Sequence, residues 1–96
     1  MEITTGFFAW DSYKELDNIC KHGVDFVTAR NVFKDHTIKI FIDSKHCLNE
    51  PRLFAVGRVE GKIMTVRFTF RENKIRIFGA GYWRKGRRYY EKKKSI

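Results

Sequence analysis

The sequence predicts an α+β fold with two N-terminal helices, a four-stranded antiparallel sheet and a basic C-terminal helix. Three observations support this prediction. The spacing of apolar residues changes from three or four to two after residue 36. Two tight turns then separate three alternating runs, and the last segment combines aromatic residues with closely spaced lysines and arginines. With 96 residues, one proline and 43% hydrophobic residues, residues 1–96 are expected to form a single domain.

Two amphipathic helices are predicted in the first third of the chain. The first has an apolar stripe at three- and four-residue steps, formed by Tyr13, Leu16, Ile19 and Cys20. Ser12 and Glu15 have the spacing of a capping box at its start, and Gly23 is typical of a left-handed helix end. The second is predicted to begin near Asp25 and to end near Asp35. Its inward residues are expected to be Phe26, Ala29, Val32 and Phe33.

Four strands are expected to follow. The first alternates two sets of residues, Ile38, Ile40 and Ile42 with Thr37, Lys39 and Phe41. The other three are placed near Arg52–Val59, Ile63–Arg71 and Lys74–Gly81, after a loop over residues 44–51. Turns at Glu60-Gly61 and Glu72-Asn73 connect these three strands, so they are predicted to form an antiparallel meander.

One face of the predicted sheet is cationic. In the third strand the core face should hold Met64, Val66, Phe68 and Phe70, and the other face Thr65, Arg67, Thr69 and Arg71. Arg76 and Phe78 of the fourth strand are expected to point the same way as Arg67. Residues 82–93 are interpreted as a basic helix that Gly86 weakens. Its aromatic residues Trp83, Tyr89 and Tyr90 either stack on bases or pack against the sheet.

The positive charge is concentrated in the second half of the chain. Residues 1–50 hold 6 Lys and Arg against 8 Asp and Glu, whereas residues 51–96 hold 14 against 3. Such clustering attracts a polyanion, and RNA is the expected one, although the terminal lysines alone are also explained as a solubilising tail. No apolar run is long enough to span a membrane, and Cys20 and Cys47 form no disulfide framework, so a cytoplasmic protein is expected.

The expected chemistry is metal-independent and needs no cofactor. The acidic residues of the basic half are sparse, namely Glu60, Glu72 and Glu91, and metal-ligand spacing is lacking among His22, His36 and His46. RNA can be cut without metal because its own 2′-hydroxyl can attack the adjacent phosphate. That reaction requires a base, an acid and cations that stabilise the developing charge.

The candidate catalytic residues lie at the loop that enters the cationic strands. Arg52, Arg67, Arg76 and Arg84 are predicted to converge on one phosphate, with His46 or Glu50 as the base. Further RNA contacts are expected from Arg67, Lys85, Arg87 and Arg88. The alternatives are ordinary ones: His46 is a surface residue, Glu50 and Arg52 form a solvated ion pair, and His22 helps to end a helix.

The chain contains, in this order, the segments FFAWD, KHGVDF, VFKD, DSKHCLNEPRLFAVGR and KIRIFGAGYWRKGRRYYE. Together they resemble the BrnT toxin family of bacterial toxin–antitoxin pairs, over nearly the whole chain. The most specific points of resemblance are Trp10-Asp11, the Lys21-His22-Gly23 turn, Glu50 with Arg52, and the terminal Arg-Arg-Tyr-Tyr.

The resemblance implies a RelE-like fold and a ribonuclease that arrests growth by cleaving RNA without a metal. It also implies a ribbon-helix-helix antitoxin, BrnA, as partner, and repression of the pair's own operon through operator DNA bound by the complex. A homodimer and a toxin–antitoxin heterotetramer are both compatible with it. The family's proposed active residues fall at Glu50 and Arg52, and others fall near the end of the fourth strand and the start of the last helix.

Three positions depart from the family pattern. Where the family usually has Ser-Ala-Arg, this chain has Gly79-Ala80-Gly81, and a glutamate usual in the final helix is replaced by Gly86. The missing arginine removes one stabiliser of transition-state charge, so either Arg84 or Arg76 substitutes for it or the nuclease is attenuated. Two other interpretations stay open: a non-catalytic nucleic-acid binder, and a module that docks an acidic protein. The RNA target, the cleaved sequence and any need for the ribosome are not predicted.

Overall fold

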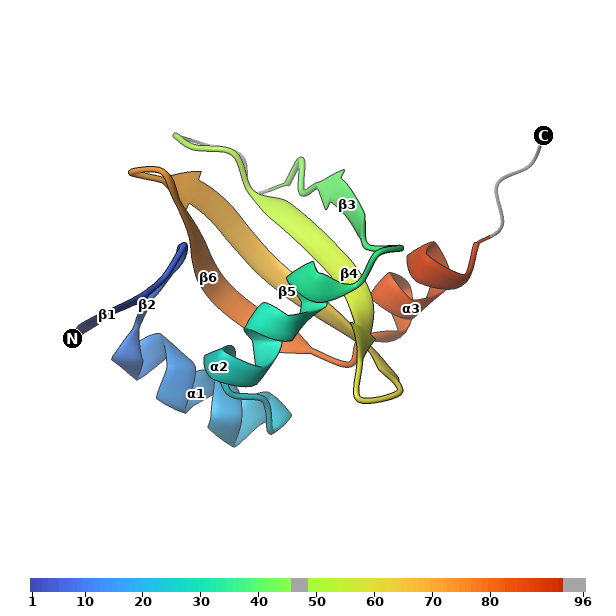
Figure 1. Cartoon of the computed structure of the whole chain (residues 1–96), viewed down its shortest axis with the longest axis horizontal. Helices are drawn as coiled ribbons and strands as arrows, with labels where there is room; N and C mark the ends of the chain where they lie inside the picture. Colours follow the sequence, from blue (N-terminus) through green and yellow to red (C-terminus); the bar gives the residue numbers. More distant parts are fainter. Residues whose placement is uncertain (46–48, 93–96) are drawn as a thin grey trace.

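The chain forms a mixed six-stranded sheet with helices on both faces (Figure 1), in a computed structural model that describes residues 1–45 and 49–92. The strand order is β1-β2-β6-β5-β4-β3. None of the helices in this described part is long and apolar enough to cross a membrane. In chain order the elements are β1 (Glu2–Thr5), β2 (Phe8–Asp11), α1 (Ser12–His22), α2 (Phe26–Ala29), the 3₁₀ helix η1 (Arg30–Lys34), β3 (Lys39–Ile42), β4 (Leu53–Val59), β5 (Lys62–Arg71), β6 (Lys74–Gly81) and α3 (Arg84–Glu91).

The predicted fold, with two N-terminal helices and a four-stranded antiparallel sheet, is wrong. Two strands precede α1: β1 pairs antiparallel with β2, and β2 pairs in parallel with β6, where Phe8 lies opposite Ile75 and Ala9 opposite Arg76. Each new strand has four residues, too few for a two-residue period to be recognised. Pairing between distant parts of the chain also leaves no local signal.

Helix α1 begins and ends close to the predicted positions, but its cap differs from the predicted one. The N-cap is Asp11, whose side chain accepts a hydrogen bond from the backbone of Lys14 at 3.1 Å. Glu15 instead accepts hydrogen bonds from the indole of Trp10 at 3.1 Å and the backbone of Phe26 at 2.9 Å. Gly23 ends the helix at φ 70°, as predicted.

The apolar stripe of α1 faces outward, contrary to the usual meaning of such a stripe. Tyr13, Leu16 and Ile19 are exposed, Leu16 at 59%. The buried residue of the helix is Asn18, which is 6% exposed and forms hydrogen bonds in both directions with the backbone of Ala80 in β6. This side chain satisfies the edge of β6 beyond the point where β2 stops pairing, which is why a polar residue faces inward.

The meander β4–β5–β6 matches the prediction. The two-residue turns contain left-handed residues, Glu60 and Gly61 in one and Glu72 and Asn73 in the other, as primed hairpin turns require. Arg67 of β5 lies opposite Gly79 of β6, whereas the next residue, Phe68, lies opposite Ile77. The register between the two strands therefore shifts between Arg67 and Phe68. Phe78 is therefore the extra residue of a β-bulge.

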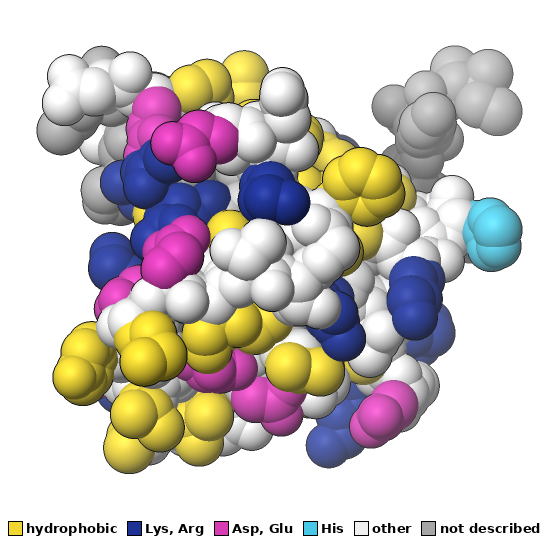
Figure 2. Space-filling view, turned by 60° about the vertical axis from the view of Figure 1, so that its left-hand side comes forward, with side chains coloured by type: hydrophobic (Ala, Val, Ile, Leu, Met, Phe, Trp, Pro, Cys, Tyr) yellow, Lys and Arg dark blue, Asp and Glu magenta, His cyan; other side chains and the backbone are white. Residues whose placement is uncertain are grey.

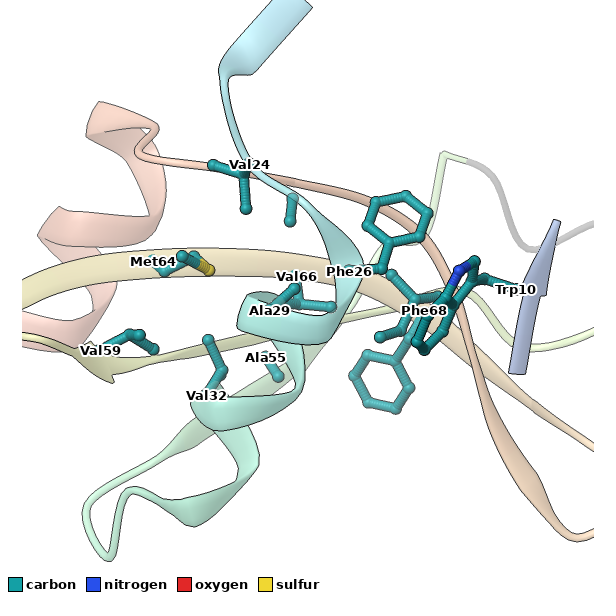
Figure 3. Close-up of a cluster of buried hydrophobic side chains, with 12 residues drawn as sticks. Trp10, Val24, Phe26, Ala29, Val32, Ala55, Val59, Met64, Val66 and Phe68 are labelled. Atoms are coloured by element: carbon teal, nitrogen blue, oxygen red, sulfur yellow. The ribbon is translucent and has the colours of Figure 1, made fainter. Parts of the chain in front are cut away.

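The core lies between one face of the sheet and the helices α2 and η1. Trp10, Phe26 and Phe68 are at most 1% exposed and lie close together in Figure 3, with the rings of Trp10 and Phe26 edge to face at 5.9 Å. The second predicted helix is a four-residue α-helix continued by the 3₁₀ turn of η1. Gly57 lets η1 pack closely against the sheet, because a Cβ at this position would lie 2.8 Å from the carbonyl oxygen of Val32.

Helix α3 packs on the opposite face. Thr65 belongs to that face, since it alternates with the buried core residues Met64 and Val66. Gly86 of α3 lies directly against it: a Cβ on Gly86 would be 1.8 Å from the Thr65 hydroxyl oxygen. The same sheet face continues past the helix to Arg67, Thr69 and the Glu50 end of β5.

Candidate phosphate-binding site

Three arginines act on one carboxylate, Glu50, at the end of β5, and a fourth, Arg67, shares a small hollow with one of them. We call this group the arginine cluster: Arg52, Arg67, Arg71 and Arg76 around Glu50 and Phe78. Arg71 donates two hydrogen bonds to Glu50, one from Nε to Oε2 at 3.0 Å and one from Nη2 to Oε1. Arg52 Nη2 lies 3.8 Å from the same Oε1 atom. In Figure 2, Lys and Arg side chains likewise gather beside Asp and Glu side chains at the upper left.

The ring of Phe78 organises the cations of this cluster. The Arg52 guanidinium lies 3.9 Å from the ring centroid, Arg71 lies 5.9 Å away, and the Lys14 ammonium approaches it at 5.2 Å. The negative face of an aromatic ring attracts cations, so one ring lowers the cost of holding several of them near each other. The ring occupies this place because Phe78 is the bulged residue of β6.

Arg76 is the most enclosed member of the cluster, with a side chain 17% exposed. Its Nη1 donates to Glu2 Oε2 of β1 at 2.6 Å, and this hydrogen bond holds the pKa of Glu2 below its usual value. The partner could not be anticipated, because β1 was not predicted.

Glu50 is ionised at neutral pH. Its pKa lies below the usual value, chiefly because Arg71 donates hydrogen bonds to the carboxylate, while desolvation opposes the shift. The charges of Arg71, Arg52 and Arg76 lower it further. Glu50 in turn raises the pKa of Arg71. A carboxylate held in this way orients its arginines well but is a weak base as long as they remain bound.

Arg67 connects the cluster to two larger hollows. Its guanidinium lies flat over Gly79, where a Cβ would be 3.1 Å from Nε and Nη2. It lines a small hollow of about 50 Å³ with Arg52 and Phe78. It also borders a hollow of about 270 Å³ with Phe78, Lys14 and the α1 terminus, and another of about 270 Å³ beside α3.

His22 is a histidine that the sequence interpretation assigned to helix termination. It does lie in the last turn of α1, but it also lines the hollow shared by Arg67 and Phe78. Its ring meets the ring of Trp83 edge to face at 5.1 Å. His46, the other histidine proposed for the site, lies outside the described residues.

The cations of α3 do not join Glu50. Arg84 is exposed in the first turn, and it is not among the residues that line the three hollows around Arg67. Arg87 pairs with Glu91 at 3.4 Å and lines a separate hollow with Arg58 and Lys62, while Arg88 is exposed. Lys85 lines the hollow beside α3. The structure therefore brings Arg52 and Arg76 together with Glu50, places Arg67 beside Arg52 and Phe78, and leaves the helix cations elsewhere.

Three further residues belong to the site although sequence reasoning did not select them. Arg71 could have been selected from the sequence, because it lies on the same face of its strand as Arg67 and Thr69. Phe78 was placed on that face, but its role as a platform depends on the bulge. Lys14 reaches it from α1, whose packing against β6 has no sequence signal. Within residues 1–45 and 49–92, no three His, Cys, Asp or Glu side chains gather in a way that could hold a metal ion.

Comparison with known proteins gives one match. A family model described as the ribonuclease toxin BrnT of type II toxin–antitoxin systems matches residues 10–86. No curated protein matches the chain. The matched range extends from β2 into the first turn of α3 and contains Glu50 and all four arginines of the cluster.

Proposed function

Because the chain belongs to the BrnT family of ribonuclease toxins of type II toxin–antitoxin systems, we propose that the arginine cluster is where it cleaves RNA, without a metal ion. The observation that carries this proposal is the convergence on the single carboxylate Glu50 of Arg52, just before β4, with Arg71 of β5 and Arg76 of β6. Arginine grips phosphate in bidentate fashion and stays charged, which suits it to stabilising a phosphoryl transition state.

In the proposed reaction, the RNA 2′-oxygen forms a bond to the adjacent phosphorus and the bond to the 5′-oxygen breaks. The 2′-hydroxyl proton passes to a base, and another proton goes to the leaving 5′-oxygen. The products are a 2′,3′-cyclic phosphate and a 5′-hydroxyl. Charge accumulates on the non-bridging oxygens, and Arg52, Arg67 and Arg71 are positioned to stabilise it.

Glu50 has two roles in this proposal. In the free protein it holds Arg71 and Arg52 in place. A bound phosphate competes for these guanidinium groups, so the pKa of Glu50 rises toward its ordinary value and the carboxylate becomes a better proton acceptor. His22 borders the neighbouring hollow that Arg67 and Phe78 also line, and an imidazole can supply the proton for the leaving oxygen.

We further propose that a ribbon-helix-helix antitoxin of the BrnA kind neutralises the protein in the cytoplasm and carries the complex to operator DNA. Family membership implies an antitoxin partner. The exposed apolar stripe of α1, formed by Tyr13, Leu16 and Ile19, is a surface that a partner would cover. Leu16→Asp should weaken antitoxin binding while leaving RNA cleavage unchanged, and loss of cleavage in that variant would count against this assignment.

The deciding experiment is cleavage of RNA by purified protein in EDTA. Arg52→Ala is expected to slow cleavage at least 100-fold with the fold retained in circular dichroism, whereas the exposed Arg88→Ala should change it by less than about threefold. RNA with a 2′-deoxy residue at the cleaved position should resist. Glu50→Gln should slow cleavage and remove the fall in rate at acid pH. Equal activity of Arg52→Ala and the native protein would refute the proposed site.

A non-catalytic or attenuated RNA binder is the second candidate. It is favoured by the engagement of both Glu50 oxygens with Arg71 and by Gly81, where the family usually places an arginine. This alternative predicts salt-dependent RNA binding without cleavage in EDTA, with Arg52→Ala weakening binding and reducing its salt dependence.

A further inference from the structure

The hollow beside α3 combines aromatic walls with a cationic rim. We call it the aromatic hollow: about 270 Å³, lined by Phe41, Phe54 and Trp83 together with Thr65, Arg67 and Lys85. Its three rings are half-buried, while Arg67 and Lys85 are exposed. Phe41 is already stacked on Phe54 and on Tyr89, with ring centroids 5.0 and 4.4 Å apart, so Phe54 and Trp83 are the rings considered for a ligand. The volume lies just below the 300–1,000 Å³ typical of drug-sized ligands, which suits one planar ring system.

Glycines in β6 and α3 maintain this hollow. A Cβ on Gly81 would lie 2.7 Å from the Trp83 ring, so glycine lets the indole lie against the strand. A Cβ on Gly86 would overlap the Thr65 hydroxyl, so glycine lets α3 approach the sheet. Despite this close approach, the 3%-exposed Thr65 keeps a hydroxyl without a hydrogen-bond partner among the described residues. Although α3 packs closely against the sheet at Gly86, the aromatic hollow beside it remains open.

We propose that the aromatic hollow binds one unpaired base of the RNA, next to the phosphate held by the arginine cluster. This inference rests on the proposed function. Base faces stack on aromatic side chains, and a neighbouring cation binds the phosphate of the same nucleotide. Arg67 lines both the aromatic hollow and the small hollow with Arg52 and Phe78, so it joins a base subsite to a phosphate subsite.

Charge favours RNA over a protein as the occupant. An apolar side chain of a partner would find the same rings, but it gains nothing from Arg67 and Lys85 at the rim. A nucleotide satisfies both features, because its base is planar and apolar on its faces and its phosphate is anionic. The hollow would then determine which bases are accepted near the cleaved bond.

The test uses the full chain and 2′-fluoro RNA pentamers, which cannot undergo 2′-hydroxyl attack. Each position in turn is made abasic, and affinity is measured by fluorescence anisotropy. One abasic position should weaken binding to the native protein about 10-fold or more. Trp83→Leu and Phe54→Leu should weaken binding of the intact pentamer similarly and abolish the effect of the abasic position. Tyr82→Leu is the matched control, since this exposed neighbour lines the hollow with Arg58 and Arg87 instead.

Two results would overturn the base subsite. One is an abasic penalty that persists unchanged in both Trp83→Leu and Phe54→Leu, and the other is no penalty at any position. If EDTA-resistant cleavage still depends on Arg52 in either case, the proposed function stands and the subsite alone is wrong. If the native protein neither cuts nor binds RNA, the proposed function fails, and the subsite fails with it.

Discussion

The two ends of the cationic sheet face use the same residue types in different ways. In the arginine cluster, basic side chains are held by carboxylates and by the Phe78 ring, so their positions are fixed before any ligand arrives. On α3, the side chains of Arg84, Arg87 and Arg88 are exposed, and the helix rather than these side chains is held in place. The difference shows that the positive charge of the second half does not form one site. Convergence on Glu50, rather than the number of cations, distinguishes the candidate catalytic end.

Groups outside α3 hold the helix in place. Lys39 Nζ donates to the carbonyls of Tyr89, Tyr90 and Lys92 at 2.8–3.1 Å, which satisfies the end of the helix. The ring of Phe41 stacks on Tyr89 at 4.4 Å, and Asp35 accepts a hydrogen bond from the Tyr90 hydroxyl. We call these contacts, together with Gly86 on Thr65, the helix seat.

The largest expected effect separates the two regions by activity. Arg67→Ala should slow RNA cleavage at least 100-fold, because it removes a cation that lines the hollow of Arg52 and Phe78, where the scissile phosphate is proposed to bind. Arg87→Ala, on the helix and paired with Glu91, should change the rate by less than about threefold. Both variants should retain native stability in urea unfolding. Equal losses of activity would mean that the helix cations also act on the phosphate, and the proposed difference between the arginine cluster and α3 would be wrong.

The next effect concerns stability at the helix seat. Gly86→Ala would favour the helix by about 1 kcal/mol through propensity alone. The added Cβ, however, falls 1.8 Å from the Thr65 hydroxyl oxygen, and overpacking of this kind costs about 1–3 kcal/mol. We therefore expect net destabilisation, relieved when Thr65→Ala removes that oxygen. A double-mutant cycle in urea should give a coupling energy of at least about 1 kcal/mol. Additive effects would contradict the close contact.

The sequence predicted the parts of the fold that have local signals. The hairpins follow from Glu60-Gly61 and Glu72-Asn73, and the cationic face follows from alternation around Arg67. The N-terminal hairpin was missed because its strands are short, and its parallel contact with β6 joins distant segments. The sequence also did not predict that the apolar stripe of α1 faces solvent. The residue that faces inward, Asn18, is polar and forms hydrogen bonds with the backbone of Ala80.

For the site, sequence selected the strand arginines and Glu50 but not their partners. Register determines which arginines meet, and the bulge at Phe78 is invisible without it. Arg84 was predicted to converge with the strand arginines, whereas the structure places it exposed at the start of α3, away from the hollows that Arg67 lines. Such a position depends on how two elements pack, which the sequence alone does not show.

A smaller effect tests the pH dependence of the helix seat. Desolvation raises the pKa of Asp35, but hydrogen bonds from Tyr90, Arg58 and Thr37 together hold it well below its usual value. Because the folded-state pKa is depressed, this stabilisation is fully present above the unfolded pKa of about 4 and is lost as pH falls below it. Asp35→Asn should cost about 1.5 kcal/mol at pH 7 and progressively less toward pH 3. Urea unfolding at both pH values measures this; a pH-independent cost would refute it.

The smallest effect compares two buried threonines on one face of β5, one in each region. Thr69 donates to the carbonyl of Pro51, beside Glu50 and Arg52, whereas the Thr65 hydroxyl under α3 has no partner within the described residues. Replacing a bonded hydroxyl by a methyl group costs about 1 kcal/mol, while removing an unsatisfied buried one gains a similar amount. Thr69→Val should therefore destabilise the protein and Thr65→Val should stabilise it, as measured by thermal unfolding. If Thr65→Val destabilises it as well, the Thr65 hydroxyl has a hydrogen-bond partner in solution, and the seat is more fully satisfied than its contacts indicate.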